Sequence, residues 1–265
     1  MLGEHLQKYL ALYVKGRRTL AEDYELVILG SGPGGYVAAI RASQLGVKTA
    51  VIEKEDVGGV CLNWGCIPSK ALLRNAEILS LFQRAGEFGI SIDNLQYDFG
   101  KAIDRSRKVV KQLTSGISYL LKKNGVDLIR GVGTFKDSKT IEINGNGHTL
   151  SSQNVIVATG ARFRTLPNLP IDGKVVITSR EALELREVPP RVVIVGGGAT
   201  GAEFAYLYRS YGADVTLVEM LPHLVPLEDE EISTHLEQAF SAQGIKSMTD
   251  TKVGGIEIGQ GSSRV

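Results

Sequence analysis

The chain has 265 residues, of which 43% are hydrophobic and 22% are charged, so it can bury a sizeable core in one large or two ordinary domains. Its formal net charge of +1 excludes the strong positive field of a nucleic-acid-binding or anionic-membrane-binding protein, and no apolar run approaches the length of a transmembrane span. The sequence holds only two cysteines, which excludes the disulfide framework of small secreted domains. We therefore expect a cytoplasmic protein with no nucleic-acid partner and no membrane partner.

Residues 1–22 precede the first predicted strand and form an N-terminal extension. Leu2, Leu6 and Leu10 have helical spacing, but Glu4 and the lack of a continuous apolar stretch argue against a signal peptide.

Residues 27–35 combine a short apolar strand with a glycine-rich turn. Gly30, Gly32 and Gly35 are followed by a helical stretch to about residue 45 and by a second apolar strand that ends at Glu53. In this βαβ pattern the first glycine permits a tight turn, the second lets the backbone approach a diphosphate, and the third lets helix and strand pack closely. The diphosphate rests on the helix N-terminus, and the carboxylate can bind ribose hydroxyls. We therefore predict a dinucleotide site here.

Cys61 and Cys66 are separated by one short loop. Pro68 and the apolar spacing after it predict a helix from residue 69 to about residue 85, with Cys66 at its N-terminus. The positive end of a helix dipole stabilises a thiolate, which favours thiol–disulfide exchange. A zinc half-site and two unrelated buried cysteines are the alternative interpretations.

The middle of the chain predicts a long helix over residues 99–123 and short strands over residues 126–129 and 140–143. Residues 144–147, Asn-Gly-Asn-Gly, suit a hairpin turn. Prolines then mark a domain boundary near residues 161–170.

The βαβ pattern recurs without a gap in the second half of the chain. Gly196, Gly198, Gly201 and Glu219 are shifted by one constant interval from the first set. An acid at this point favours NAD, because Glu219 repels the 2′-phosphate of NADP and the next two residues supply no arginine. The acidic residues 228–231 predict the first turn of a further helix.

Residues 58–70 closely resemble the active-site segment of the class I flavin-dependent pyridine nucleotide disulfide oxidoreductases, and within that family most resemble the dihydrolipoyl dehydrogenases. The resemblance runs from residue 24 to the end of the chain and matches only the N-terminal part of the family. It implies an α/β fold with two Rossmann-like, doubly wound nucleotide-binding domains. Residues 23–165 would form the FAD-binding domain with the redox-active dithiol, and residues 166–265 a partial NAD-binding domain; the C-terminal dimerisation domain would be absent.

The resemblance also implies roles for individual residues. Cys61 would be the interchange thiol that meets the substrate, and Cys66 the inner thiol against the flavin. Lys70 would approach the flavin and pair with Glu203, where a cation stabilises developing negative charge. The cofactor-binding residues, in addition to Lys70, would be Gly30, Gly32, Pro33, Gly34, Gly35, Glu53, Lys54, Gly59, Gly133, Thr159, Gly160, Gly196, Gly198, Gly201, Glu219 and Val253. No metal is expected.

The function implied is a flavin-dependent oxidoreductase that passes electrons between a dihydrolipoyl-type dithiol, the two cysteines, FAD and NAD. The dithiol would be the dihydrolipoyl group of a 2-oxoacid dehydrogenase or of a glycine-cleavage carrier protein, and the full-length family is homodimeric. A mercuric or other small-disulfide reductase is an alternative, and a catalytically incomplete flavin- or nucleotide-binding module is an alternative of another class.

The family's general base is a histidine from the C-terminal domain of the partner subunit. None of the four histidines of this chain lies in a matching context. We therefore expect a partial chain, incomplete for turnover and poorly soluble because of an unpaired sheet edge.

Overall fold

The computed structural model describes residues 22–145, 147–259 and 263–265. The expected N-terminal extension lies outside the described residues except for residue 22, which begins the first strand. The chain divides into two compact units. The first contains residues 22–59 and 114–160, and the second contains residues 60–113 and the described residues from 161 onward. The assignment of residues 23–165 to one nucleotide-binding domain stays a prediction.

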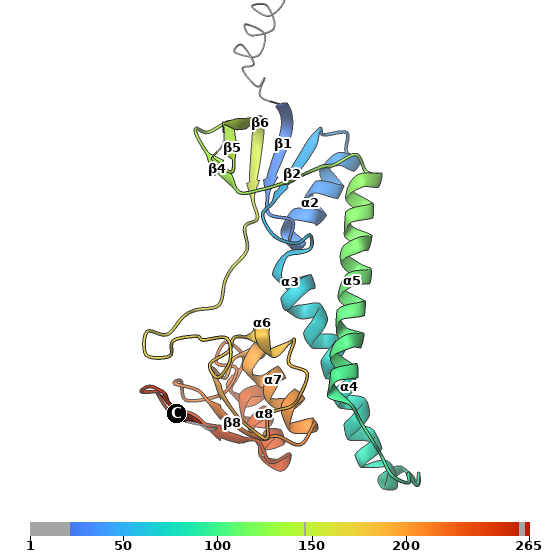
Figure 1. Ribbon diagram of the computed structural model, residues 1–265, viewed down its shortest axis with the longest axis vertical. Coiled ribbons are helices and arrows are strands. Elements are labelled where there is room, and N and C mark those ends of the chain that lie inside the picture. The colour runs from blue at the N-terminus through green and yellow to red at the C-terminus, as the bar shows by residue number, and fades with distance from the viewer. Residues whose placement is uncertain (1–21, 146, 260–262) are drawn as a thin grey trace, which may run out of the picture. The chain divides into compact units, whose positions relative to one another are not determined.

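The first unit is built on a six-stranded sheet (Figure 1). Its strands are β1 (Glu22–Leu29), β2 (Thr49–Glu53), β3 (Asp127–Arg130), β4 (Gly133–Phe135), β5 (Thr140–Ile143) and β6 (His148–Val157). The order is β3-β2-β1-β6-β5-β4, in which β3, β2, β1 and β6 run parallel and β4 and β5 form an antiparallel extension. The predicted hairpin joins β5 to β6, although residue 146 of its turn lies outside the described residues.

Strand β1 is apolar over its whole C-terminal half because both faces of the sheet are covered. Leu26 and Ile28 pack with residues of helix α2 (Pro33–Gln44), whereas Val27 and Leu29 pack with apolar residues of β5 and β6. A strand that is buried on both faces has a continuous run of hydrophobic residues in its sequence. This burial fixes β1 and α2, and with them the glycine-rich turn between them.

The second unit contains a three-stranded parallel sheet and most of the helices. Its strands are β7 (Arg191–Val195), β8 (Asp214–Val218) and β9 (Lys246–Met248), in that order, with a separate antiparallel pair, β10 (Glu257–Ile258) and β11 (Ser263–Arg264). Its helices are α4 (Cys66–Gln83), the 3-10 helix η1 (Ala85–Phe88), α6 (Ser179–Ala182), α7 (Ala199–Ser210) and α8 (Glu230–Ala242). Helices α3 (Gly59–Trp64) and α5 (Phe99–Lys123) have residues in both units.

The predicted helix over residues 99–123 is confirmed, and the predicted helix after the second cysteine begins at Cys66 and ends at Gln83. Asp229 caps α8, since its carboxylate accepts a hydrogen bond from the backbone N–H of Glu231 (2.9 Å). The acidic run therefore forms the start of a helix, as predicted.

An aromatic cluster holds α5, α6 and α7 together in the second unit. Phe99 lies against Tyr211 and Tyr208, with ring centroids 4.8 and 6.3 Å away. Burial raises the pKa of the Tyr208 hydroxyl, which donates a hydrogen bond to the carbonyl of Ala182 (3.1 Å). Helix α4 packs on α7 in the same core through Leu72 and other apolar side chains. These contacts fix α4 and α7, the helices that carry Cys66 and the predicted ion pair.

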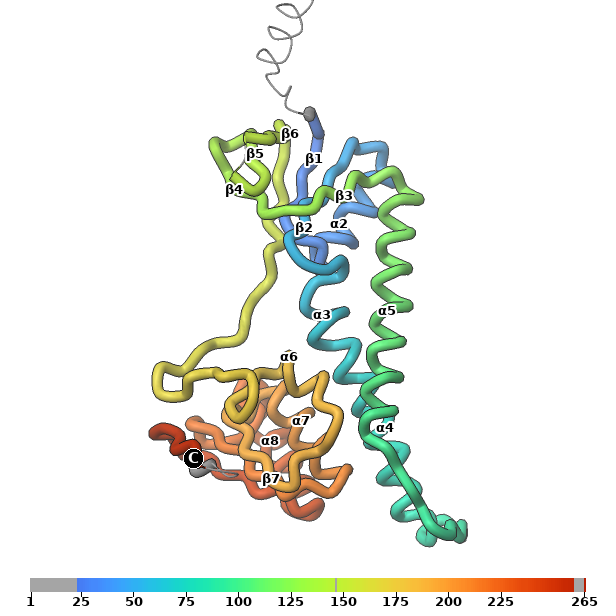
Figure 2. The backbone as a smooth tube through the Cα atoms, viewed as in Figure 1, coloured from blue at the N-terminus to red at the C-terminus, as the bar shows by residue number. Residues whose placement is uncertain are grey.

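Residues 158–178 connect β6 to α6 without a helix or strand, as the chain trace shows (Figure 2). The connection ends in a capping box at Thr178 and Glu181, which fixes the start of α6. Within the described part of the chain, every helix falls short of the length or the apolar character that a membrane span requires.

Candidate functional site

The first glycine-rich turn requires glycine at its two ends for steric reasons. Gly30 has φ = +96°, and a Cβ at this position would lie 2.4 Å from the carbonyl oxygen of Ala158. A Cβ on Gly35 would lie 1.9 Å from the carbonyl oxygen of Gly30. The first glycine therefore makes the turn, and the third allows α2 to approach β1.

The second turn repeats this geometry. Gly196 has φ = +109°, and a Cβ on Gly201 would lie 1.9 Å from the carbonyl oxygen of Gly196. The repeat seen in the sequence is thus a repeat of structure, with α7 in the place of α2.

The central glycines differ, because the protein itself has room for a side chain there. Gly32 has φ = −67°, and the nearest atom to a Cβ would be the Cα of Gly59 at 3.9 Å. Gly198 has φ = −71°, and no atom of the described residues would lie within 4 Å of a Cβ. Each is the N-cap of its helix and makes no side-chain capping bond. Neither helix start is capped by a side chain, and both leave open space at the central glycine, which suits a diphosphate at the positive end of the helix dipole.

The two predicted ribose-binding carboxylates are buried and brace the turns. Glu53 accepts hydrogen bonds from the backbone N–H and hydroxyl of Ser31 (2.8 and 2.6 Å) and from the N–H of Glu55 (2.8 Å). Glu219 accepts from the N–H groups of Gly197 (2.7 Å) and Leu221 (2.9 Å). A carboxylate has about four lone-pair sites, so the two hydrogen bonds to Glu219 leave acceptor capacity for a ribose hydroxyl.

The hydrogen bonds also set the charge state of Glu53. Burial raises the pKa of this carboxyl, but the Ser31 hydroxyl and the N–H groups of Glu55, Ser31 and Lys54 together outweigh it. The pKa of Glu53 consequently lies below its usual value near 4.5, and the carboxylate is charged at neutral pH.

Two further predicted cofactor residues have packing roles in the structure. A Cβ on Gly59, which has φ = +60°, would lie 2.8 Å from the Cα of Gly32. A Cβ on Gly133 would lie 2.8 Å from Leu29 and 3.1 Å from Ile52. Gly59 thus keeps the segment before the cysteines close to the turn, and Gly133 permits dense packing around β4.

The remaining predicted cofactor positions are exposed or half-buried, and their roles stay predictions. The carbonyl of Val253 accepts a hydrogen bond from Nδ2 of Asn168 (2.7 Å), and Gly160 has φ = +73°. The full set is Pro33, Gly34, Lys54, Thr159, Gly160 and Val253.

Cys61 and Cys66 form a disulfide, with their Cα atoms 4.7 Å apart. Cys61 lies in α3, and Cys66 is the first residue of α4 after the N-cap Gly65, so the predicted place of Cys66 at a helix N-terminus is confirmed. The helix dipole there stabilises the thiolate that reduction would produce. In the residues that the structure describes, no group of three or more His, Cys, Asp or Glu side chains could hold a metal.

The predicted ion pair between Lys70 and Glu203 is present and joins α4 to α7. The side chain of Lys70 is 61% exposed and that of Glu203 is 29% exposed. Both residues line an open groove of about 500 Å³, together with Leu73, Arg74, Glu77, Ala202, Tyr206, Leu236 and Phe240. An ion pair this exposed contributes little to the free energy of unfolding. The positive charge of Lys70 is therefore available to a ligand.

Two arginines contact the segment between the cysteines, and neither was predicted from the sequence. Nη1 of Arg107, on α5, donates a hydrogen bond to the carbonyl of Asn63 (2.9 Å). The guanidinium of Arg180, on α6, stacks 3.8 Å from the ring centroid of Trp64. Both contacts join residues that are distant along the chain, so no local pattern could predict them.

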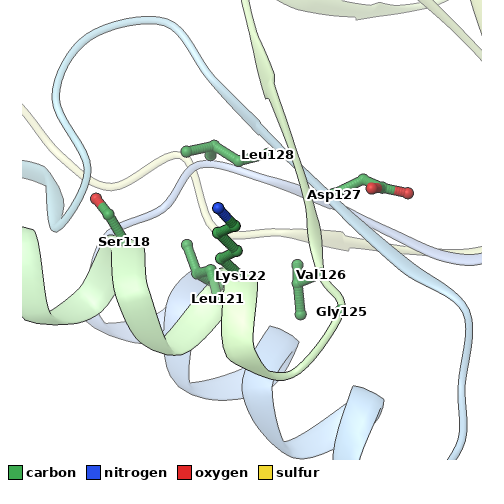
Figure 3. A pocket seen from close by; sticks show the side chains of 7 residues that line it. All are labelled: Ser118, Leu121, Lys122, Gly125, Val126, Asp127 and Leu128. Carbon is green, nitrogen blue, oxygen red and sulfur yellow. The ribbon is translucent and has the colours of Figure 1, made fainter.

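A second hollow, of about 320 Å³, lies in the first unit where α5 ends and β3 begins (Figure 3). It is lined by Ser118, Leu121, Lys122, Gly125, Val126, Asp127 and Leu128. No residue predicted to bind a cofactor or to act in catalysis is among them.

Comparison with known proteins matches residues 24–264 to the family described as pyridine nucleotide-disulphide oxidoreductase. The dihydrolipoyl dehydrogenase of Mycobacterium tuberculosis is 47% identical over 240 residues, which are 89% of this chain and 51% of that protein. The dihydrolipoyl dehydrogenase of Chlorobaculum parvum is 43% identical over 241 residues, which are 90% of this chain and 51% of that protein.

Solved structures give the same result for the fold. The crystal structure of LpdA from Mycobacterium tuberculosis has a TM-score of 0.80 at 29% identity and covers 89% of this chain and 53% of that one. The flavoprotein disulfide reductase RclA from Escherichia coli, solved as a Cu(II) complex, has a TM-score of 0.78 at 27% identity over 91% of this chain and 52% of its own. The predicted α/β, Rossmann-like fold is thereby confirmed, and the chain spans about half the length of the curated relatives it matches.

Proposed function

Because the chain belongs to the pyridine nucleotide-disulphide oxidoreductase family, we propose that it is the dinucleotide-binding and dithiol part of an enzyme of the dihydrolipoyl dehydrogenase type. In this proposal electrons pass between a dihydrolipoyl dithiol, the Cys61–Cys66 disulfide, FAD and NAD. The relatives that share 43–48% identity and carry the name dihydrolipoyl dehydrogenase support the substrate class.

The observation that carries the proposal is the open space at the central glycine of both turns. The protein's own packing explains Gly30, Gly35, Gly196 and Gly201, but it leaves room for a methyl group at the central positions. A ligand that needs the backbone to come close accounts for glycine there, and a dinucleotide diphosphate is such a ligand. Two turns of this kind in one chain support two dinucleotides.

The residues that would hold each dinucleotide follow from this geometry. The start of α2 would bind the diphosphate of FAD and Glu53 its ribose, whereas the start of α7 and Glu219 would bind NAD. When bound, FAD supplies a two-electron link between the nicotinamide and the disulfide. Lys70 would hold positive charge beside it, and Glu203 would orient the lysine.

The cysteines would exchange with the substrate in two steps. A substrate thiolate attacks Sγ of Cys61, the S–S bond breaks, and Cys66 leaves as a thiolate that the N-terminus of α4 stabilises. The second substrate thiol gives its proton to solvent, and its thiolate attacks the substrate sulfur of the mixed disulfide. Cys61 leaves as a thiolate, and the substrate leaves as a cyclic disulfide. Cys66 is the more exposed of the two in this structure, so the division of roles between the cysteines rests on the helix-dipole argument.

The biological setting is also proposed from the relatives. The dithiol would be the dihydrolipoyl group of a 2-oxoacid dehydrogenase or of a glycine-cleavage carrier protein. The complete enzyme would act as a cytoplasmic homodimer.

The test uses the two central glycines as reciprocal controls. Gly32→Ala places a methyl group where FAD would lie, and Gly198→Ala does the same for NAD. We expect Gly32→Ala to lower the affinity for FAD by at least tenfold without changing that for NAD, and Gly198→Ala to do the reverse. FAD retention after gel filtration and NAD titration by calorimetry measure the two affinities.

Equal binding by the two variants and the unmodified chain would contradict the assignment of the two sites. Selective loss of each cofactor together with failure to reduce the disulfide by NADH would favour the catalytically incomplete module over the oxidoreductase.

A further inference from the structure

Two guanidinium groups hold consecutive residues of the dithiol loop, which we define as residues 61–66. Arg107 binds the backbone of Asn63, and Arg180 binds the ring of Trp64. The arginines come from α5 and α6, and all of these residues belong to the second unit. The loop is therefore held from two sides at the two positions midway between the cysteines.

Arg107 acts on the end of helix α3. The last carbonyls of a helix lack partners within the helix, and a cation there is favourable. Its Nη1 fills this role by donating to the carbonyl of Asn63 (2.9 Å), and Oε1 of Glu184 lies 3.6 Å from the same nitrogen. The carbonyl of Asn63 is thereby fixed to α5.

The surroundings of Arg107 leave it little freedom. Its Nε and Nη2 are buried and have no hydrogen-bond partner among the described residues. Burial lowers the pKa of Arg107, and the charge of Glu184 offsets part of this effect. A guanidinium that is partly desolvated makes the hydrogen bond that remains to it stronger. Arg107 is therefore a rigid anchor for the loop.

Arg180 holds the loop through a flat contact. Its guanidinium carbon lies 3.8 Å from the centroid of the Trp64 ring, within the range of a cation–π interaction. The backbone N–H of Arg180 donates to Oγ1 of Thr178 (3.2 Å) in the capping box, and the carbonyl of Ala182 accepts from Tyr208. The short helix that carries Arg180 is thus fixed at both ends.

We infer that Arg107 and Arg180 are positioning residues that keep the thiols of Cys61 and Cys66 at bonding distance when the disulfide is reduced. The inference rests on the proposed function, because only a disulfide that opens during the reaction needs such support. In the oxidised protein the S–S bond itself fixes the loop. After reduction only non-covalent contacts keep the two thiols close. The contacts of Arg107 with Asn63 and of Arg180 with Trp64 hold the residues between the two cysteines.

Loop positioning predicts a definite sign for the redox equilibrium. Thiols that are held together close into a disulfide more readily, since their effective concentration is higher. Removal of a positioning contact therefore favours the reduced form. If the arginines acted instead by stabilising thiolates through their charge, their removal would favour the oxidised form. The direction of the change separates the two explanations.

Arg180→Ala is the main test variant, because Arg180 is exposed and its loss leaves no cavity. Arg74→Ala is the matched control, since Arg74 is exposed on α4 and its only ion pair among the residues that the structure describes is with Glu77. Equilibration of the 265-residue chain with mixtures of reduced and oxidised dithiothreitol gives the equilibrium constant, and each disulfide opened consumes one dithiol and forms one cyclic disulfide. We expect Arg180→Ala to lower the constant for disulfide formation by about threefold to tenfold, which is about 14–30 mV, and Arg74→Ala to leave it unchanged.

Trp64 is the only tryptophan of the chain, so its fluorescence reports on the loop alone. Acrylamide quenching should be similar in oxidised and reduced wild-type protein. In Arg180→Ala it should rise on reduction, because the loop then loses both the S–S bond and the stacking contact. Trp64→Leu combined with Arg180→Ala should shift the redox equilibrium no further than Trp64→Leu alone, since both changes break one contact.

Arg107→Met should shift the equilibrium in the same direction as Arg180→Ala, with Arg107→Lys restoring part of the shift. No difference between Arg180→Ala and Arg74→Ala, or a shift toward the oxidised form, would overturn the inference. These readouts need only the disulfide and Trp64. A failure of the proposed cofactor binding would therefore appear as a loss of FAD and NAD affinity with the loop measurements unaffected.

Discussion

The third glycine of each turn offers the sharpest test of the fold that supports the proposed cofactor sites. In Gly35→Ala the new Cβ would lie 1.9 Å from the carbonyl oxygen of Gly30, and both the clashing oxygen and the Cα that carries the methyl group belong to the backbone. No side-chain rotation can relieve this overlap. Helix α2 must move away from β1 by more than an ångström, which opens the packing between Ile28 and Ala39.

The expected cost is about 3 kcal/mol, the upper end of the usual range for overpacking, because the neighbouring atoms cannot yield. For a chain of this size that corresponds to roughly 6–12 °C in melting temperature. Gly116→Ala is the matched control, since Gly116 lies inside α5 in the same unit and a Cβ there would meet no atom of the described residues within 4 Å. The control should gain up to about 1 kcal/mol from the higher helix propensity of alanine.

Thermal unfolding followed by circular dichroism measures both variants. A melting temperature of Gly35→Ala equal to that of Gly116→Ala would refute the close approach of α2 to β1. Loss of FAD binding by Gly35→Ala should accompany the loss of stability, because the N-terminus of α2 moves with the helix.

Three further predictions concern charged residues. Lys70→Met should slow flavin reduction by NADH by roughly a hundredfold. Because the ion pair of Lys70 with Glu203 is exposed, the free energy of unfolding should change by less than about 1 kcal/mol. A larger loss of stability would mean that the ion pair serves to stabilise the fold. Glu53→Gln should lose about 2 kcal/mol at pH 7. The pKa of Glu53 is lowered in the folded protein, so its contribution is present above pH 4.5 and lost as the pH falls through the folded value; urea unfolding at several pH values should therefore show the variant and wild type converging below pH 4.5. Glu219→Ala should reduce the preference for NAD over NADP by at least tenfold in binding titrations, and an unchanged preference would exclude Glu219 from the ribose site.

The sequence was sufficient for the features that depend on local pattern. The two glycine turns, the helix over residues 99–123 and the place of Cys66 follow from glycine spacing, helical periodicity and proline preference, all of which act within a few residues. The ion pair of Lys70 with Glu203 also came from the sequence, but only through resemblance to a family.

Features with a misleading local pattern, or with contacts to distant residues, could not be predicted in this way. Helix α3 was missed because glycines at 58, 59 and 65 suggest a loop, and β4 is too short to show a period. Arg107 and Arg180 look like ordinary charged residues of helices, since only the fold brings them to Asn63 and Trp64. Gly133 was predicted as a cofactor contact. The structure gives a second reason for glycine at this position, because Leu29 and Ile52 leave no room for a side chain. The sequence alone does not show this packing.

The most direct test of the proposed electron path is a count of thiols after anaerobic addition of NADH to the FAD-loaded chain. Reduction of one disulfide by one NADH and one proton gives NAD and two thiols. We expect two new thiols for each NADH oxidised, assigned to Cys61 and Cys66 by alkylation and mass spectrometry. Oxidation of NADH without any new thiol at these cysteines would contradict the proposed electron path.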